Sequence, residues 1–383
     1  MTTTNNLGLY VHIPFCLRKC NYCDFLSFAC ADEKVLMEYA DALALETGIS
    51  YERWPYKIVD SSFIGGGTPS IVPAKGMRKI LDAIRSNFVV ADDCEITIEA
   101  NPATLTDEKI ATYLECGINR ISIGIQSFDN SILKMLGRAH DKNDAINAVR
   151  MVKHGGFENI NIDLMFGIPG QTVKMWRDTV RQCTFLEPKH ISLYSLQIEE
   201  GTPFYRMIYE NKVIEELPEE TDREMYHESL HILENEGFSR YEISNACIPG
   251  YESRHNLKYW SYGDYLGLGP GASSFMDGHR FKNISKIPEY LKFIKSGLPP
   301  VKQEDIEEYS AREEMGIYIF TALRKVEGFS ISDFEKTFTC DFFDVYDPQI
   351  LQKLRGLLVA EGQNLRLTER GFDVSNRVMA EFV

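Results

Sequence analysis

Short hydrophobic runs alternate with longer amphipathic segments through the first half of the chain. Six runs have the length of a strand: Leu7–Ile13, Val59–Ile64, Glu95–Glu99, Arg120–Gln126, Asn159–Leu164 and His190–Ser195. Apolar residues recur at helical intervals in the segments between them, which include Glu33–Ser50, Ala74–Asn87, Lys142–His154 and Val173–Phe185. Strands that alternate with helices in this way predict a parallel α/β array.

The two faces of the predicted strands differ in polarity. In the fourth run one face carries Ile121, Ile123 and Ile125, and the other carries Ser122, Gly124 and Gln126. The first, third and fifth runs show the same division. A complete eight-stranded barrel fills its interior with branched apolar side chains, which these polar faces do not provide. We therefore expect an open six-stranded (β/α)6 partial barrel, with helices outside and a polar lumen around a polar cofactor.

The chain divides into three expected domains. Residues 1–240 form the barrel and end with a helix at Glu219–Gly237, residues 241–298 form an extension rich in glycine and aromatic residues, and residues 299–383 form a C-terminal domain. The second boundary is placed at Gly297-Leu298-Pro299-Pro300 because Gly and Pro interrupt regular elements. The last domain reads as mostly helical, with a short strand at Leu365–Leu367.

Composition and charge narrow the class of protein. Hydrophobic residues make up 44% and charged residues 25%, as in ordinary globular proteins. A net charge of −15 argues against a nucleic-acid partner, and the C-terminal domain, whose pattern suggests a winged helix, has 10 basic and 16 acidic residues. No apolar stretch reaches the ~18 residues that span a bilayer, and the start lacks a signal-peptide pattern. We expect a cytoplasmic protein that is not integral to a membrane; peripheral association stays open.

Three of the nine cysteines lie within eight residues, at Cys16, Cys20 and Cys23. This Cys-x3-Cys-x2-Cys spacing brings three thiolates into one small volume. A four-iron cluster held by only three cysteines keeps one iron open to a ligand. The alternative is a zinc site with His12 or Cys30 as the fourth ligand, but zinc sites favour paired Cys-x2-Cys spacings.

Further polar residues fall where predicted strands end. Gly65-Gly66-Gly67 follows the second strand, Glu99 ends the third, Gln126 ends the fourth, and Asp163 lies near the end of the fifth. Each alone reads as a turn or a polar strand terminus. Because the carboxyl ends of barrel strands meet at one edge, their shared level favours a common ligand site.

The cysteine spacing resembles the signature of the radical S-adenosylmethionine (SAM) superfamily, in which the open iron of a [4Fe–4S] cluster binds SAM. Five more segments resemble blocks of the HemN/HemW branch of that superfamily and cover most of the barrel: Tyr10–Cys16, Gly65–Pro69, Ile98–Pro102, Gly124–Ser127 and Asn161–Leu164. The resemblance implies that the three cysteines hold the cluster. It also supports the partial barrel as the fold.

The same resemblance implies a SAM site, residue by residue. Its members are Tyr10, Tyr22, Gly66, Gly67, Thr68, Glu99, Gln126, Arg138, Asp163 and Ser195. Arg138 differs from the rest, because its own segment, Leu136–His140, reads as exposed surface.

Two features resemble the heme chaperones of this branch. The dehydrogenases carry a further cysteine two residues after the third cluster cysteine, where this chain has Phe25. The segment His255-Asn256-Leu257-Lys258-Tyr259-Trp260 resembles the His-Asn-x-x-Tyr-Trp motif of the chaperones. Histidine is a common axial ligand of heme iron, and Tyr259 and Trp260 can stack on a porphyrin. Without the resemblance, the motif reads more readily as a structural loop.

The resemblance implies a heme chaperone that binds a [4Fe–4S] cluster, SAM and heme, and that passes heme to apo-hemoproteins. A protein that donates heme or electrons is an expected partner, and a homodimer is compatible with this role. The alternative is an oxygen-independent coproporphyrinogen III dehydrogenase, which would convert two propionates to vinyl groups by radical decarboxylation. A third reading is a radical enzyme for another tetrapyrrole. The pattern assigns no catalytic residue.

Overall fold

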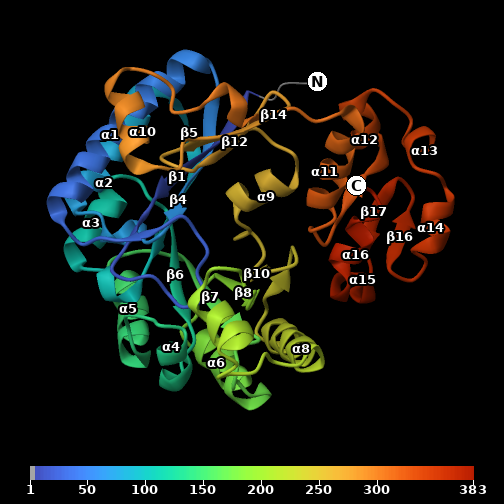
Figure 1. The fold of residues 1–383 in the computed structure, drawn as a ribbon. Coiled ribbons are helices and arrows are strands. Elements are labelled where there is room, and N and C mark those ends of the chain that lie inside the picture. Colours follow the sequence, from blue (N-terminus) through green and yellow to red (C-terminus); the bar gives the residue numbers. More distant parts are fainter. Residues whose placement is uncertain (1–4) are drawn as a thin grey trace.

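The computed structural model describes residues 5–383. Six parallel strands lie side by side in chain order: β1 (Asn6–Ile13), β4 (Ile58–Gly66), β5 (Val89–Ala100), β6 (Arg120–Gln126), β7 (Asn159–Phe166) and β8 (His190–Ser195). Helices cover the outside of the curved sheet (Figure 1). The expected α/β partial barrel is confirmed. Part of the segment read for a signal peptide, residues 1–4, lies outside the described range.

Local capping starts the outer helices where the sequence places polar residues. Asp32 accepts a hydrogen bond from the Lys34 backbone at the start of its helix, and Asp141 and Asp144 form a capping box. The helices of this layer are α1 (Glu33–Arg53), α2 (Ala74–Asn87), α3 (Asp107–Glu115), α4 (Asn130–Met135), α5 (Lys142–His154), α6 (Val173–Phe185) and α8 (Glu219–Asn235).

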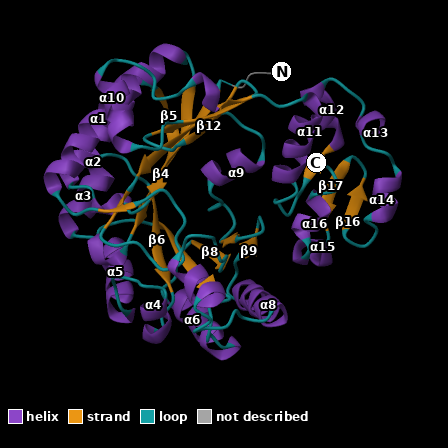
Figure 2. Ribbon diagram, viewed as in Figure 1, coloured by secondary structure: helices purple, strands orange, loops and turns teal. Residues whose placement is uncertain are grey.

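The sheet continues beyond the six expected strands at both ends. Next to β1 lies β11 (Tyr265–Leu268), which is also parallel, followed by antiparallel β12 (Ser273–Met276), β13 (His279–Lys282) and β14 (Ile306–Glu307). Beyond β8 lie the short strands β10 (Asn245–Cys247) and β9 (Ser239–Arg240). The segment that follows the barrel therefore adds strands at both edges of the sheet, and Figure 2 labels one on each side, β12 near β5 and β9 near β8.

The two faces of the barrel strands have the expected polarity. On the outer face Leu9, Val11 and Ile13 are fully buried in the main hydrophobic core beneath the helices. On the inner face Asn161 donates hydrogen bonds to Ser122 and Ser192. Because these buried polar groups satisfy one another, they close the floor of the lumen without an apolar core.

The C-terminal region has a hydrophobic core of its own, built around Phe329, Phe334 and Leu365. A three-stranded sheet of β15 (Phe329–Ser330), β17 (Asn364–Leu367) and β16 (Leu358–Glu361) replaces the single expected strand. Its helices are α11 (Ala311–Ala322), α12 (Ile331–Phe338), α13 (Phe342–Val345), α14 (Gln349–Lys353), α15 (Glu369–Asp373) and α16 (Ser375–Met379).

Three further helices are α7 (Pro203–Tyr205), α9 (Arg254–Trp260) and α10 (Ile287–Lys295), the last of which packs against α1 in the outer layer. Helix α9 contacts both β4 and α11, and Figure 1 shows it between the barrel and the C-terminal region. In the part of the chain that the structure describes, none of the helices is both long and apolar enough to traverse a bilayer.

Candidate cofactor site and the adjoining cavity

The cysteine motif forms a loop at the carboxyl end of β1. Cys16 lies in β2 (Phe15–Cys16), which pairs with β3 (Phe28–Ala29), and Cys20 and Cys23 lie in the loop between these strands. Asn21 fixes the loop to the end of α4, because its backbone N–H donates to Leu136 O and its side chain donates to Met135 O.

Hydrogen-bond donors are directed at two of the three sulfurs. Thr68 Oγ1 lies 3.4 Å from Cys16 Sγ, and Arg138 Nη1 lies 3.4 Å from Cys20 Sγ. Burial raises the pKa of the Cys16 and Cys23 thiols. Within residues 5–383, no three His, Cys, Asp or Glu side chains are grouped closely enough to hold a metal ion. The donors nevertheless suit thiolates, which fits cluster ligation by this loop.

His12 is engaged and does not offer a nitrogen to a zinc ion. Its Nε2 lies 2.9 Å from Leu26 O, which can only accept, so Nε2 carries the proton. Its Nδ1 then accepts from the Tyr10 hydroxyl at 2.9 Å. Burial lowers the pKa of His12, which keeps the ring neutral. This geometry disfavours the zinc alternative with His12 as the fourth ligand.

The glycines after β4 are required by close contacts. Gly66 has a φ of 109°, and a Cβ on it would lie 2.5 Å from the His12 ring. A Cβ on Gly67 would lie 2.7 Å from Phe15 O and 3.0 Å from Cys16 Sγ. The glycine loop therefore packs directly against the cysteine loop.

Two carboxylates lie in the lumen near the same level. Gly66 N–H donates to Glu99 Oε2 at 3.2 Å, while Ser122 and Asn161 donate to Asp163 at 2.9 and 2.8 Å. Burial, with the charge of Asp163 adding to it, raises the pKa of Glu99 to about 8. Such a carboxyl ionises readily beside a cation, which suits the ammonium group of a ligand.

Gln126 and Arg138 also reach this site. Gln126 has a φ of 71° at a bulge in β6, and its buried Oε1 has no hydrogen-bond partner among the described residues. Arg138 Nη2 donates to Gly124 O, and Nη1 lies 3.5 Å from the Tyr22 hydroxyl. The reading of Arg138 as exposed surface is wrong, because the chain after α4 turns the guanidinium inward toward Cys20.

The remaining predicted SAM residue, Ser195, lies at the end of β8. Its hydroxyl donates to Asp222 Oδ2 of α8. A Cβ on nearby Gly167 would lie 2.6 Å from the same carboxylate oxygen, so this contact is tight. The predicted SAM residues thus come from one rim of the barrel; that they bind SAM stays a prediction.

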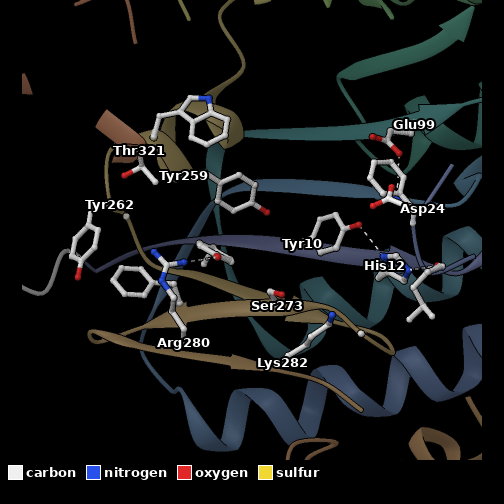
Figure 3. A pocket seen from close by; sticks show the side chains of 18 residues that line it. Tyr10, His12, Asp24, Glu99, Tyr259, Tyr262, Ser273, Arg280, Lys282 and Thr321 are labelled. Carbon is white, nitrogen blue, oxygen red and sulfur yellow. Dashed lines mark hydrogen bonds between the residues drawn. The ribbon is translucent and has the colours of Figure 1, made fainter. Parts of the chain in front are cut away.

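A cavity of about 630 Å³ adjoins this rim (Figure 3). Tyr10, His12, Gly66 and Glu99 line one end of it. The opposite walls are lined by aromatic residues: Tyr259, Trp260, Tyr262, Tyr265 and Phe275. The cavity therefore connects the predicted SAM site with the His-Asn-x-x-Tyr-Trp segment, and its size lies in the range of small-molecule sites.

His255 itself is buried beneath the cavity. Its Nδ1 lies 3.1 Å from Ser61 Oγ, and its Nε2 lies 2.8 Å from the Tyr259 hydroxyl. Burial lowers its pKa to about 3, so the ring is neutral. In this geometry His255 positions Tyr259, and Tyr259 and Trp260 rather than His255 line the cavity. An iron bond to His255 requires that its contact with Tyr259 open.

Three residues near the lumen had no signal in the sequence that linked them to the site. Arg280 and Lys282 of β13 line the cavity, and Arg120 of β6 is buried below it with an unpartnered Nε. Charged and apolar residues alternate along Arg280-Phe281-Lys282, as in a strand with one buried face, but three residues are too few to predict a strand from sequence. The position of β13 in the sheet, separated from β1 by β12 and β11, depends on long-range strand pairing, which residue spacing does not reveal.

Comparison with known proteins agrees with this architecture. Residues 10–183 match the radical SAM superfamily, and residues 309–374 match the HemN C-terminal domain. The crystal structure of coproporphyrinogen III oxidase (HemN) from Escherichia coli superimposes with a TM-score of 0.84 at 21% identity, covering 100% of this chain and 91% of that one. The fold and the two domains define a radical SAM protein of the HemN type.

Full-length relatives define the family further. The heme chaperone HemW of Lactococcus lactis is 35% identical over 376 residues, covering 98% of this chain and 96% of the relative. The HemW proteins of Bacillus subtilis and Escherichia coli are each 34% identical, covering 98% of both chains. The chain belongs to the HemW family of heme chaperones.

Proposed function

We propose that this protein is a heme chaperone on a radical SAM scaffold, which binds a [4Fe–4S] cluster, SAM and heme and delivers heme to apo-hemoproteins. The observation that carries the proposal is the cavity that runs from Tyr10 and Glu99 to Tyr259 and Trp260. Its lining includes both rings proposed to contact heme and residues proposed to bind SAM, which supports one site for the two ligands. Membership of the HemW family supplies the choice of heme as the ligand.

Cys16, Cys20 and Cys23 are the proposed cluster ligands. A bound [4Fe–4S] cluster would supply an open iron that binds SAM and can reduce it. The unpartnered Oε1 of Gln126 and the Glu99 carboxyl offer acceptors to the polar groups of SAM. Arg138 and Thr68 direct N–H and O–H groups at the cluster sulfurs.

Tyr259 and Trp260 are the proposed stacking residues for heme, with His255 as the candidate axial ligand. The Tyr259 hydroxyl occupies His255 Nε2 at 2.8 Å. A heme titration of wild type, Tyr259→Ala and His255→Ala, followed by absorbance, tests these roles. Loss of heme affinity in all variants that remove a ring or the imidazole supports the site. Wild-type affinity no greater than that of an unrelated acidic protein contradicts it.

The alternative function is coproporphyrinogen III dehydrogenation, and the structural likeness to HemN is the observation that favours it. Against it, Phe25 stands where the dehydrogenases have a further cysteine, and its side chain is 62% exposed. One anaerobic reaction of cluster-loaded protein with SAM, reductant and coproporphyrinogen III separates the two. Decarboxylated porphyrin together with 5′-deoxyadenosine establishes the dehydrogenase; unchanged porphyrin supports the chaperone.

The proposed partners are apo-hemoproteins and a protein that donates heme or electrons, and a homodimer remains a prediction. Nine free cysteines among the described residues fit a reducing compartment, so we also propose a cytoplasmic location. Sedimentation velocity of the protein with and without the cluster tests the dimer: a higher sedimentation coefficient with the cluster would support it.

A further inference from the structure

We propose that Arg280 and Lys282 of β13 bind the two carboxylates of the tetrapyrrole in the cavity. The inference rests on the proposed function and adds an orientation to it: the carboxylate-bearing edge of the tetrapyrrole lies on β13. Figure 3 shows both side chains rising from the same strand, at positions two residues apart, below Tyr10 and Tyr259.

Strand pairing brings these two cations to the cavity wall. In the antiparallel register of β12 and β13, Ser273 pairs with Lys282 and Phe275 pairs with Arg280. Paired residues and residues two apart share a face of the sheet, so all four side chains face the cavity. This face continues the inner face of β1 through β11, which contributes Tyr265.

Arg280 is held in place without a countercharge. Its guanidinium carbon lies 4.7 Å from the centre of the Phe275 ring, and its Nη1 donates to the Tyr265 hydroxyl at 3.3 Å. Glu307 of β14 is the strand partner of Arg280, but its carboxylate accepts a hydrogen bond from Tyr309, and the ion pairs of the described residues do not include one between Glu307 and Arg280. The fork of the guanidinium remains available to a bidentate carboxylate.

Lys282 forms neither a hydrogen bond nor an ion pair with any residue of the described chain. Its ammonium group lies close enough to His12 to contribute, after burial, to the lowered pKa of that ring. The ammonium is therefore directed along the cavity toward β1. Lys282 is exposed and Arg280 is half-buried, and neither has a carboxylate partner among the described residues, so both cations can accept an anion that enters the cavity.

The rest of the cavity specifies the body of the ligand. Its aromatic lining suits a flat, largely apolar ring system, and Trp260 is itself held by Arg324, which lies 4.4 Å from the ring centre. Asp24 lines the cavity beside Glu99, and its carboxylate would repel a propionate placed there. A tetrapyrrole with two adjacent propionates satisfies both requirements; SAM has a single carboxylate and no extended ring system.

The test compares heme with heme dimethyl ester, in which both carboxylates are blocked, in one detergent buffer. The proteins are wild type, Arg280→Gln/Lys282→Gln, and the control Lys292→Gln/Lys295→Gln, which removes two exposed charges from α10. We expect wild type and control to bind heme at least tenfold more tightly than the ester, since a hydrogen bond to a charged group is worth about one factor of ten. In the double variant that ratio should fall to near one.

Each outcome decides the inference. A ratio near one in wild type, or an unchanged ratio in the Arg280→Gln/Lys282→Gln variant, overturns it while heme binding itself stands. Failure of wild type to bind heme at all overturns the proposed function as well. SAM binding, measured on the same variants, should not change; if it is lost while the ester ratio persists, the cations serve the SAM carboxylate and the inference is wrong.

Discussion

Glu99 is the residue whose charge state responds most directly to a ligand. Burial, then Asp163, raises its pKa to about 8, and Gly66 N–H is its hydrogen-bond donor. Its position at the end of a strand could be predicted from the sequence, but its protonation could not, because that depends on Asp163 two strands away. The position of Arg138, in contrast, could not be predicted from its local segment, which indicated an exposed side chain. Only the family resemblance assigned Arg138 to the site.

Binding of SAM should therefore depend on pH. The ammonium group of SAM favours ionised Glu99, which is protonated in the free protein below pH of about 8. Binding then releases a proton, so affinity rises with pH up to about 8, by at most about tenfold per pH unit, and levels off above it. Calorimetry between pH 6 and 9 measures this slope, and Glu99→Gln should remove it. A slope retained in Glu99→Gln assigns the proton to another group.

Gly67 allows the cysteine and glycine loops to touch. Gly67→Ala places a methyl group 2.7 Å from Phe15 O and 3.0 Å from Cys16 Sγ. Since backbone cannot yield as a side chain does, we expect Cys16 to be displaced and the iron bound after reconstitution to fall by more than half. Gly48→Ala on α1, whose added Cβ meets only ordinary contacts, is the matched control. Equal iron content in both variants would contradict this account of the loop.

At the scale of elements, a buried carboxylate joins the extension to the barrel. Glu46 of α1 accepts from Gly269 N–H at 2.7 Å, from Asn283 at 2.8 Å and from the Tyr290 hydroxyl at 2.6 Å. These donors belong to the segment after β11, the segment after β13 and α10. Sequence periodicity predicted the barrel helices, with α2, α5 and α6 at the expected bounds. It missed β11–β14, because short strands are placed by contacts such as these.

Glu46→Gln should weaken this junction. One of the three donors would face the amide N–H instead of an acceptor, and an unsatisfied buried group costs about 1–3 kcal/mol. The unfolding free energy from urea titration should fall by that amount. Glu52→Gln, on an exposed position of the same helix, should leave it unchanged. A stability equal to that of wild type would show that the carboxylate is not required.

For the whole molecule, the C-terminal region completes the wall of the cavity. Thr321 of α11 lines it, and Arg324 stacks on Trp260. Backbone hydrogen bonds from Ile243 to Arg324 and from Val326 to Tyr241 fix the region to the segment after β9. The division of the chain at residues 240 and 298 stays a prediction. A separate C-terminal core, built around Phe334, could be anticipated from the Gly-Pro boundary. The contact of the C-terminal region with α9 could not.

Arg324 is expected to stabilise this junction through charge as well. Its guanidinium lies 3.9 Å from Glu242 Oε2, and the Glu242 side chain is fully buried. Arg324→Ala leaves that carboxylate without its cation, which should lower the unfolding free energy by about 3 kcal/mol. Arg377→Ala, at an exposed position of α16, is the control. Equal urea midpoints for the two variants would contradict the assignment.

Heme transfer tests the central claim most directly. Cluster-loaded protein carrying heme is mixed anaerobically with increasing concentrations of apo-hemoproteins, and the transfer rate is followed by absorbance. A chaperone hands heme over within a complex, so the account predicts a rate that rises with acceptor concentration and falls in Trp260→Ala. Two results would contradict it. One is a transfer rate that does not change with the concentration of any acceptor; the other is a protein that binds no heme but converts coproporphyrinogen III.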